Sequence, residues 1–147
     1  MEIAILALGC FWGPEIKFDK LEGVTKTEVG YCGGNSDTTT YEKVCSGSTN
    51  HAEVVKLEFD PLKISYEKIL EYFFNIHNPT TLNAQGPDIG TQYRSEIFYV
   101  NENQMKIAEN IIEENNKKLS GKVVTKLSKI KNYCKAEEYH QRYLEKK

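Results

Sequence analysis

Residues 3–14, Ile-Ala-Ile-Leu-Ala-Leu-Gly-Cys-Phe-Trp-Gly-Pro, join a short apolar run directly to a proline typical of helix starts. A continuous apolar run of this length predicts a buried β-strand over residues 3–8. Pro14 suits the first turn of a helix, where its missing N–H leaves no hydrogen bond unmade. Cys10 is therefore expected at a strand-to-helix junction, near free backbone N–H groups and the positive end of a helix dipole. We predict that this position lowers the pKa of the thiol and makes its thiolate a nucleophile.

The pattern of apolar residues and turn signals along the rest of the chain predicts a mixture of strands and helices. Helices and strands do not alternate strictly, which favours an α+β fold or a two-layer α/β sandwich over a doubly wound sheet. Residues 78–93 have no regular period and are expected to form a functional loop. The expected helices cover residues 14–21, 41–44, 66–77, 101–119 and 136–144, and the expected strands cover residues 24–31, 52–59, 96–100 and 123–127.

The composition is that of an ordinary globular protein, with 147 residues, 39% apolar and 27% charged. We expect a single domain over residues 1–147, long enough to bury a core. A net charge of −2 gives no electrostatic footprint for nucleic acid or for an anionic membrane, so neither is an expected partner. The opening apolar run follows Glu2 rather than a basic region, so we interpret it as a strand and not a signal peptide. A reducing, cytoplasmic setting is the resulting expectation.

The four cysteines are Cys10, Cys32, Cys45 and Cys134. Two disulfides are possible by number but weakly supported without a secretion signal. A metal site is also weakly supported, because no Cys-x-x-Cys pair exists and the three histidines are scattered. Cys32 and Cys45 are expected to be small buried hydrophobic side chains.

The strand expected at residues 52–59 contains an acidic residue on its apolar side. Side chains alternate between faces with period two, so Glu53 shares a face with Val55, Leu57 and Phe59. An apolar setting disfavours the ionised carboxyl and raises its pKa. A protonated Glu53 would be a proton donor at neutral pH. The alternative is that Glu53 lies at the exposed start of the strand, where burial is incomplete.

A nucleophilic thiol, an aromatic pair, a buried acid and nearby tyrosine hydroxyls suit attack on an electrophile whose oxygen must be protonated. Sulfoxides fit that description, because their sulfur becomes electrophilic when the oxygen is protonated or strongly hydrogen-bonded. Attack at sulfur would leave a sulfenic acid on Cys10 and release a thioether.

Seven runs spread over nearly the whole chain carry a resemblance to a known family. In these runs the chain resembles the A-type peptide methionine sulfoxide reductases (MsrA), in the order that the family has. Chance similarity would not reproduce seven runs in register. The runs cover residues 9–13 (GCFWG), 30–34 (GYCGG), 41–47 (YEKVCSG), 51–55 (HAEVV), 83–88 (NAQGPD), 92–95 (QYRS) and 138–144 (EYHQRYL).

The resemblance implies a reaction and the residues that perform it. Cys10 matches the nucleophile, and Glu53 matches the acid that protonates the sulfoxide oxygen. Tyr41 and Tyr93 match hydroxyls that hydrogen-bond that oxygen. The implied activity is reduction of the S epimer of methionine sulfoxide, free or in oxidised proteins, without metal or organic cofactor, in repair of oxidative damage. The implied fold is a two-layer sandwich of ferredoxin-like type, with a mixed sheet.

The resemblance also implies how substrate is held. Phe11 and Trp12 match the aromatic pair around the S-methyl group. Asp88 matches a polar contact to the substrate backbone, and Tyr143 matches a residue at the mouth of the site.

Regeneration of Cys10 is where the chain departs from the family pattern. Many members carry resolving cysteines beyond the final Tyr-His-Gln segment, whereas this sequence ends at residues 145–147, Glu-Lys-Lys. We expect an external thiol reductant, glutaredoxin with glutathione or thioredoxin, with an internal disulfide to Cys134 as the alternative. Some members use selenocysteine at the position of Cys10, and the sequence leaves open whether Cys10 replaces one.

Two other function classes compete with a reductase. A redox sensor or binding module could recognise oxidised methionine without turnover, but it would not need the thiol, the acid and both hydroxyls together. A peroxide-reducing thiol enzyme would not require the aromatic pair. His51 and His140 are expected to order nearby backbone, and Arg94 is expected to stabilise its loop or a carboxylate.

Overall fold

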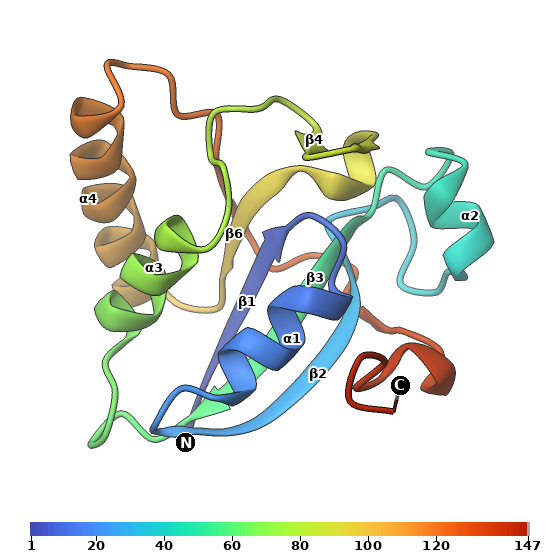
Figure 1. Ribbon diagram of the computed structural model, residues 1–147, viewed down its shortest axis with the longest axis horizontal. Helices are drawn as coiled ribbons and strands as arrows, with labels where there is room; N and C mark the ends of the chain where they lie inside the picture. The colour runs from blue at the N-terminus through green and yellow to red at the C-terminus, as the bar shows by residue number, and fades with distance from the viewer. Residues whose placement is uncertain (147) are drawn as a thin grey trace.

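The computed structural model describes residues 1–146, and its centre is a twisted six-stranded sheet (Figure 1). The strand order is β7-β6-β1-β3-β2-β8. Neighbouring strands are antiparallel except for β6 and β7, which are parallel. The strands are β1 (Glu2–Leu8), β2 (Val24–Cys32), β3 (Ala52–Phe59), β6 (Ser95–Tyr99), β7 (Lys126–Lys129) and β8 (Cys134–Lys135).

The three longer helices cover one face of the sheet, which gives the two layers of a mixed α+β fold (Figure 1). The fourth, α2, lies apart from them beside the end of the sheet where β3 begins (Figure 1). A small ribbon of β4 (Ala84–Gln85) and β5 (Asp88–Ile89) and two 3-10 turns, Thr91–Tyr93 and Glu138–His140, complete the chain. The helices are α1 (Trp12–Asp19), α2 (Tyr41–Cys45), α3 (Tyr66–Asn75) and α4 (Glu102–Lys118).

Strict alternation along β1 divides the core between the two faces of the sheet. Ala4, Leu6 and Leu8 belong to the large cluster on the helix side, whereas Ile5 and Ala7 belong to a smaller cluster on the other face. A strand that is buried on both faces reads as a continuous apolar run, which explains the pattern seen at residues 3–8. Strand β1 lies within the sheet, between β6 and β3. Cys10 follows its C-terminal end and therefore lies where the sheet meets the helix layer.

Most of the expected elements are confirmed, with shifted ends. The strand β3 has the predicted bounds, whereas α1 begins two residues before Pro14 and β7 begins three residues after the start of the predicted strand at 123–127. Asn101 caps α4 as expected, since its side chain accepts a hydrogen bond from the Gln104 N–H at 2.8 Å.

The helix predicted at residues 136–144 is wrong, because this segment makes its hydrogen bonds with distant parts of the chain instead. The side-chain amide of Gln141 accepts from the Val29 N–H and donates to the Val29 carbonyl, both at 2.9 Å, as a neighbouring strand would. The Arg142 N–H donates to the buried carboxylate of Glu15 at 2.7 Å. Arg142 also has a φ of +52°, which no α-helix contains. These tertiary bonds override the local helical pattern.

Candidate functional site

Cys10 lies in the turn between β1 and α1, as its sequence context predicts. The turn depends on Gly9, which has a φ of +98° and packs so closely on Gln85 that a Cβ there would lie 2.9 Å from that side chain. The Cys10 side chain is partly buried, and its sulfur accepts a hydrogen bond from the Trp12 N–H, the first of the helix α1. The thiol thus faces the start of the helix with one backbone donor aimed at it.

Glu53 lies directly beside this turn and is 1% exposed. One carboxyl oxygen, Oε1, accepts a hydrogen bond from the N–H of Phe11, the neighbour of Cys10, at 3.2 Å. The other oxygen, Oε2, is buried and has no hydrogen-bond partner within residues 1–146. The pKa of Glu53 is raised to about 8, chiefly by burial and in small part by the charge of Asp88, and the Phe11 N–H offsets only part of the rise. The predicted proton-bearing carboxyl is therefore placed beside the thiol.

The prediction of a lowered thiol pKa is wrong. The pKa of Cys10 is raised to about 11, chiefly by burial and in smaller part by the negative charges of Glu53 and Asp88. The Trp12 N–H acts in the expected direction but does not outweigh burial. At neutral pH the free protein therefore holds both Cys10 and Glu53 in their protonated forms.

Two tyrosines from different elements complete the polar side of the site. Tyr93, in the 3-10 turn after the β4–β5 ribbon, has a pKa raised to about 12 by burial and by the charge of Glu53. Tyr41 begins α2, and burial together with a hydrogen bond to Cys45 raises its pKa as well. Both phenols therefore keep their protons at neutral pH and remain hydrogen-bond donors.

The aromatic side of the site is a stack built around Trp12. The ring of Tyr143 stacks on the indole with centroids 3.9 Å apart. The indole N–H donates to Nδ1 of His140 at 3.0 Å, and burial lowers the pKa of that histidine, which keeps Nδ1 free to accept. The Phe11 ring is buried behind this stack, 5.3 Å from the ring of His140. An apolar surface of fixed orientation thus lies next to the thiol.

The remaining cysteines are all free thiols, and they differ from each other in placement. Cys32 is buried as predicted, but Cys45 is exposed, so the expectation of a buried Cys45 is wrong. Cys45 ends α2, a short helix with one buried residue, and its thiol accepts the Tyr41 hydroxyl. Cys134 lies on the edge strand β8 opposite Tyr31, with its sulfur 3.9 Å from the carbonyl oxygen of Thr39.

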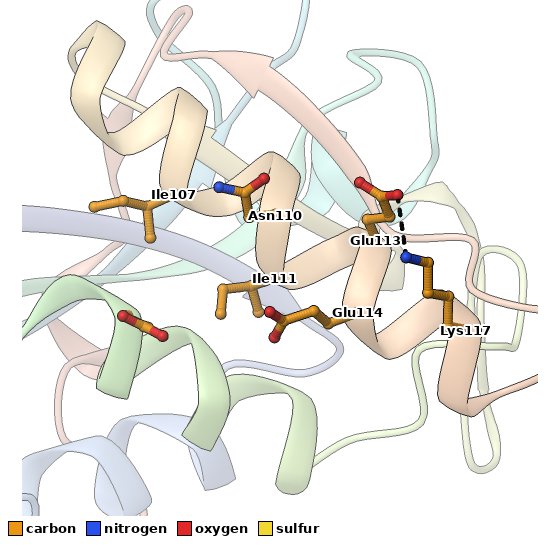
Figure 2. Close-up of a pocket in the computed structure, with 7 residues that line it drawn as sticks. Ile107, Asn110, Ile111, Glu113, Glu114 and Lys117 are labelled. Carbon is orange, nitrogen blue, oxygen red and sulfur yellow. Dashed lines mark ion pairs between the residues drawn. The ribbon is translucent and has the colours of Figure 1, made fainter.

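A groove between α3 and α4 lies away from these residues. It has a volume of about 310 Å³ and is lined by the side chains labelled in Figure 2, with Glu67 on the opposite helix. Glu113 and Lys117 form an exposed ion pair along its edge at 3.5 Å (Figure 2). The groove contains none of the cysteines and none of the aromatic stack, so it is a solvated seam between two helices.

Residues 1–146 contain neither a candidate metal site nor a candidate membrane-spanning helix. No group of three or more His, Cys, Asp and Glu side chains there could hold a metal ion. None of the helices there is both long and apolar enough to cross a membrane.

The family model described as peptide methionine sulfoxide reductase matches residues 2–147. The chain belongs to this family. A peptide methionine sulfoxide reductase MsrA of Pelagibacter ubique is 74% identical over 147 residues and is covered completely, as is this chain. The MsrA of Saccharolobus solfataricus is 51% identical over 146 residues, covering 99% of this chain and 82% of the relative. The protein is thus an oxidoreductase of the MsrA type.

Solved structures agree with this membership of the MsrA family. Reduced Mxr1 from Saccharomyces cerevisiae superposes with a TM-score of 0.94 at 40% identity, covering 99% of this chain and 84% of Mxr1. Methionine sulfoxide reductase A of Corynebacterium diphtheriae gives the same TM-score at 35% identity, covering 99% of this chain and 74% of the other. Mxr1 in complex with Trx2 superposes with a TM-score of 0.69 at 27% identity, covering 97% and 84%.

Some residues around the MsrA site had no assigned role in the sequence. His140 was expected to order backbone, but it accepts the indole N–H of Trp12 instead. No sequence pattern indicated a contact between Glu137 and Tyr31, because it joins residues about a hundred positions apart. His51 does order backbone, through the carbonyl of Ser36 at 2.8 Å.

Arg94 was expected to stabilise its loop or a carboxylate, and it does both. Its Nε pairs with the Glu96 carboxylate at 2.6 Å, and its Nη1 donates to the Thr91 carbonyl at 2.9 Å. The Arg94 side chain therefore braces the turn that carries Tyr93.

The burial of Glu53 predicts a pH-dependent difference in stability between the wild type and Glu53→Gln. An unfolded glutamate ionises near pH 4.5, whereas folded Glu53 keeps its proton until about pH 8. The contribution of protonated Glu53 to stability is complete below pH 4.5 and is lost as the pH rises through 8. Glu53→Gln should therefore gain stability relative to wild type over this interval, by up to about 1.4 kcal/mol per pH unit. Urea unfolding of both proteins at pH 4, 6 and 8 measures this difference in stability. A difference that does not change with pH would contradict the burial of an acid here.

Proposed function

We propose that this protein reduces the S epimer of methionine sulfoxide, free or within oxidised proteins, to methionine in repair of oxidative damage. The observation that carries the proposal is the buried carboxyl of Glu53, with one oxygen on the Phe11 N–H and the other unpartnered beside the Cys10 thiol. The membership of the MsrA family supports the substrate class. The fold also supports kinship with ferredoxin-like sandwiches, because four successive antiparallel strands follow the order β6-β1-β3-β2.

In the proposed reaction, Phe11 and Trp12 hold the S-methyl group while Tyr41 and Tyr93 donate hydrogen bonds to the sulfoxide oxygen. Glu53 gives its proton to that oxygen, which makes the sulfur electrophilic. The Cys10 thiolate then attacks the sulfoxide sulfur and forms an S–S bond. The protonated oxygen passes to the Cys10 sulfur as the S–S bond and the substrate S–O bond break and a Cys10 S–O bond forms, so Cys10 becomes a sulfenic acid and the thioether leaves.

The bound sulfoxide itself favours ionisation of the Cys10 thiol, which is protonated in the free protein. Its sulfur carries partial positive charge, and an opposite charge next to a thiol favours the thiolate. Because Glu53 already carries its proton at neutral pH, its charge does not oppose the thiolate when substrate binds. We assign Asp88 and Tyr143 to the mouth of the site, as contacts to the polypeptide that flanks the oxidised methionine.

The first test is a stereochemical assay with dithiothreitol and racemic N-acetyl methionine sulfoxide. Consumption should stop at half of the racemate, with only the R epimer left and one methionine formed per sulfoxide lost. Cys10→Ser should abolish the activity, because a hydroxyl is a far weaker nucleophile at this pH. Binding without turnover would indicate a sensor, and consumption of hydrogen peroxide in preference to sulfoxide would indicate a peroxidase.

Glu53→Gln tests the proton donor through the pH profile of kcat/KM, which reports ionisations in the free enzyme. The wild-type value should rise to about pH 8 and then level off, because loss of the Glu53 proton offsets the gain of Cys10 thiolate. Glu53→Gln should be slower by about 10²-fold at pH 7 and should keep rising above pH 8. A variant with the wild-type break in its profile would assign that ionisation to another group.

Regeneration of Cys10 is proposed to use an external thiol, a thioredoxin or glutaredoxin with glutathione. Two thiols of the reductant would return Cys10 to its thiol form and release one disulfide and one water. The complex between the relative Mxr1 and Trx2 supports a reductant of the thioredoxin type. An internal disulfide to Cys134 is the second candidate. A reducing, cytoplasmic setting belongs to the same proposal.

Mass spectrometry of enzyme given excess substrate without reductant separates the two routes. The external route predicts a Cys10 sulfenic acid that dimedone traps, in equal yield in wild type and in Cys134→Ser. A disulfide joining Cys10 to Cys134 or to Cys45 would replace the external route by an internal one.

A further inference from the structure

The carboxylate of Glu137 ties together two elements of the site that do not otherwise share a hydrogen bond. Its Oε1 accepts the hydroxyl of Tyr31 at 2.8 Å, and its Oε2 accepts the backbone N–H of Tyr41 at 2.9 Å. Tyr31 lies one residue before the end of β2, whereas Tyr41 begins α2. Burial raises the pKa of Glu137, but the Tyr41 N–H and the Tyr31 hydroxyl outweigh it, so the net pKa is lowered. Glu137 is therefore an anion at neutral pH, and both bonds are charge-assisted.

The helix α2 has few other attachments to the rest of the protein. Only Val44 of its five residues is buried. At the far end, the Gln92 amide reaches the Cys45 carbonyl at a long 3.5 Å. The N-cap Thr40 bonds only within the helix, to the Lys43 N–H. The bond from the Tyr41 N–H to Glu137 is thus the shortest polar attachment of α2 to another element.

We propose that Glu137 is a positioning residue, which fixes the start of α2 so that the Tyr41 hydroxyl meets the substrate oxygen. This inference rests on the proposed function, in which that hydroxyl is a donor. In the free protein the Tyr41 hydroxyl is held by Cys45, a weak sulfur acceptor that a sulfoxide oxygen readily replaces. The ring of Tyr41 also packs on the ring of His140, with 4.4 Å between centroids. The Glu137 carboxylate thus fixes the backbone of Tyr41, and His140 fixes its ring.

The chain offers a clean way to separate Glu137 from Tyr41. The bond to Glu137 uses the backbone of Tyr41, so Tyr41→Phe removes the hydroxyl and leaves that bond in place. Glu137→Ala removes both acceptor oxygens of the carboxylate, whereas Gln would keep a carbonyl for the Tyr41 N–H and an NH₂ that the Tyr31 hydroxyl can accept. Glu138→Ala is the matched control, since the neighbouring Glu138 side chain is 82% exposed and pairs with Lys135 within residues 1–146.

The experiment is a double-mutant cycle on kcat and KM with racemic N-acetyl methionine sulfoxide. Glu137→Ala should lower kcat about tenfold with KM within about twofold of wild type, because the Tyr41 contact strengthens in the transition state. In the Tyr41→Phe background the same change should cost less than about twofold. Glu138→Ala should match wild type. A full tenfold loss in both backgrounds would overturn the proposal, because Glu137 would then act without the Tyr41 hydroxyl.

Tyr31→Phe supplies the second, independent test. It removes the other donor to Glu137 but leaves the Tyr41 N–H bond, so kcat should stay within about twofold of wild type. If Tyr31→Phe reproduces the loss seen in Glu137→Ala, the carboxylate acts through Tyr31 and its neighbour Phe11, and the proposal is wrong. The Tyr41→Phe single variant tests the proposed function separately. Wild-type turnover in that variant would show that the Tyr41 hydroxyl has no role in the reaction.

Discussion

The site depends on one carboxyl that is removed from water without an ion-pair partner within the described chain. Glu53 occupies an inward position of β3, where the strand's alternation otherwise places Val55, Leu57 and Phe59. A buried carboxyl without a cation keeps its proton, because the desolvation of its charge costs more than a single N–H bond returns. That N–H belongs to Phe11, so the contact that holds Glu53 also fixes the backbone beside Cys10. The same hydrogen bond therefore belongs to the packing of the fold and to the proposed chemistry of the site.

The aromatic side of the site is held by chain segments from the opposite end of the sequence. The C-terminal segment lies along β2 through the Gln141 amide, which pairs with both polar backbone groups of Val29. This fixes His140 and Tyr143 against Trp12. Arg142 adds an ion pair with Asp19 at 2.7 Å, so α1 is tied at its end as well as at its start. The orientation of the Trp12 ring is thus set by residues more than a hundred positions away.

The sequence predicted those parts of the site that depend on local pattern. Cys10 follows from an apolar run that meets a helix start, and Glu53 follows from a period of two in one strand. The coil at 136–146 and the exposure of Cys45 could not be predicted in this way, because tertiary bonds decide them. The prediction of a lowered pKa for Cys10 was wrong for a related reason. The helix-start N–H is visible in the sequence, whereas the burial and the carboxylates that oppose it arise only when distant segments meet.

The raised pKa of Cys10 fits a reaction that needs no proton from solvent. In the proposed step, a thiol and a sulfoxide become a sulfenic acid and a thioether, so the proton lost by sulfur is balanced by the one that ends on oxygen. Glu53 delivers a proton to oxygen, and the thiol proton can restore it. A thiol that is ionised in the free enzyme would react with other electrophiles before substrate arrived. Burial of both groups in their protonated forms therefore couples formation of the thiolate to the arrival of a sulfoxide.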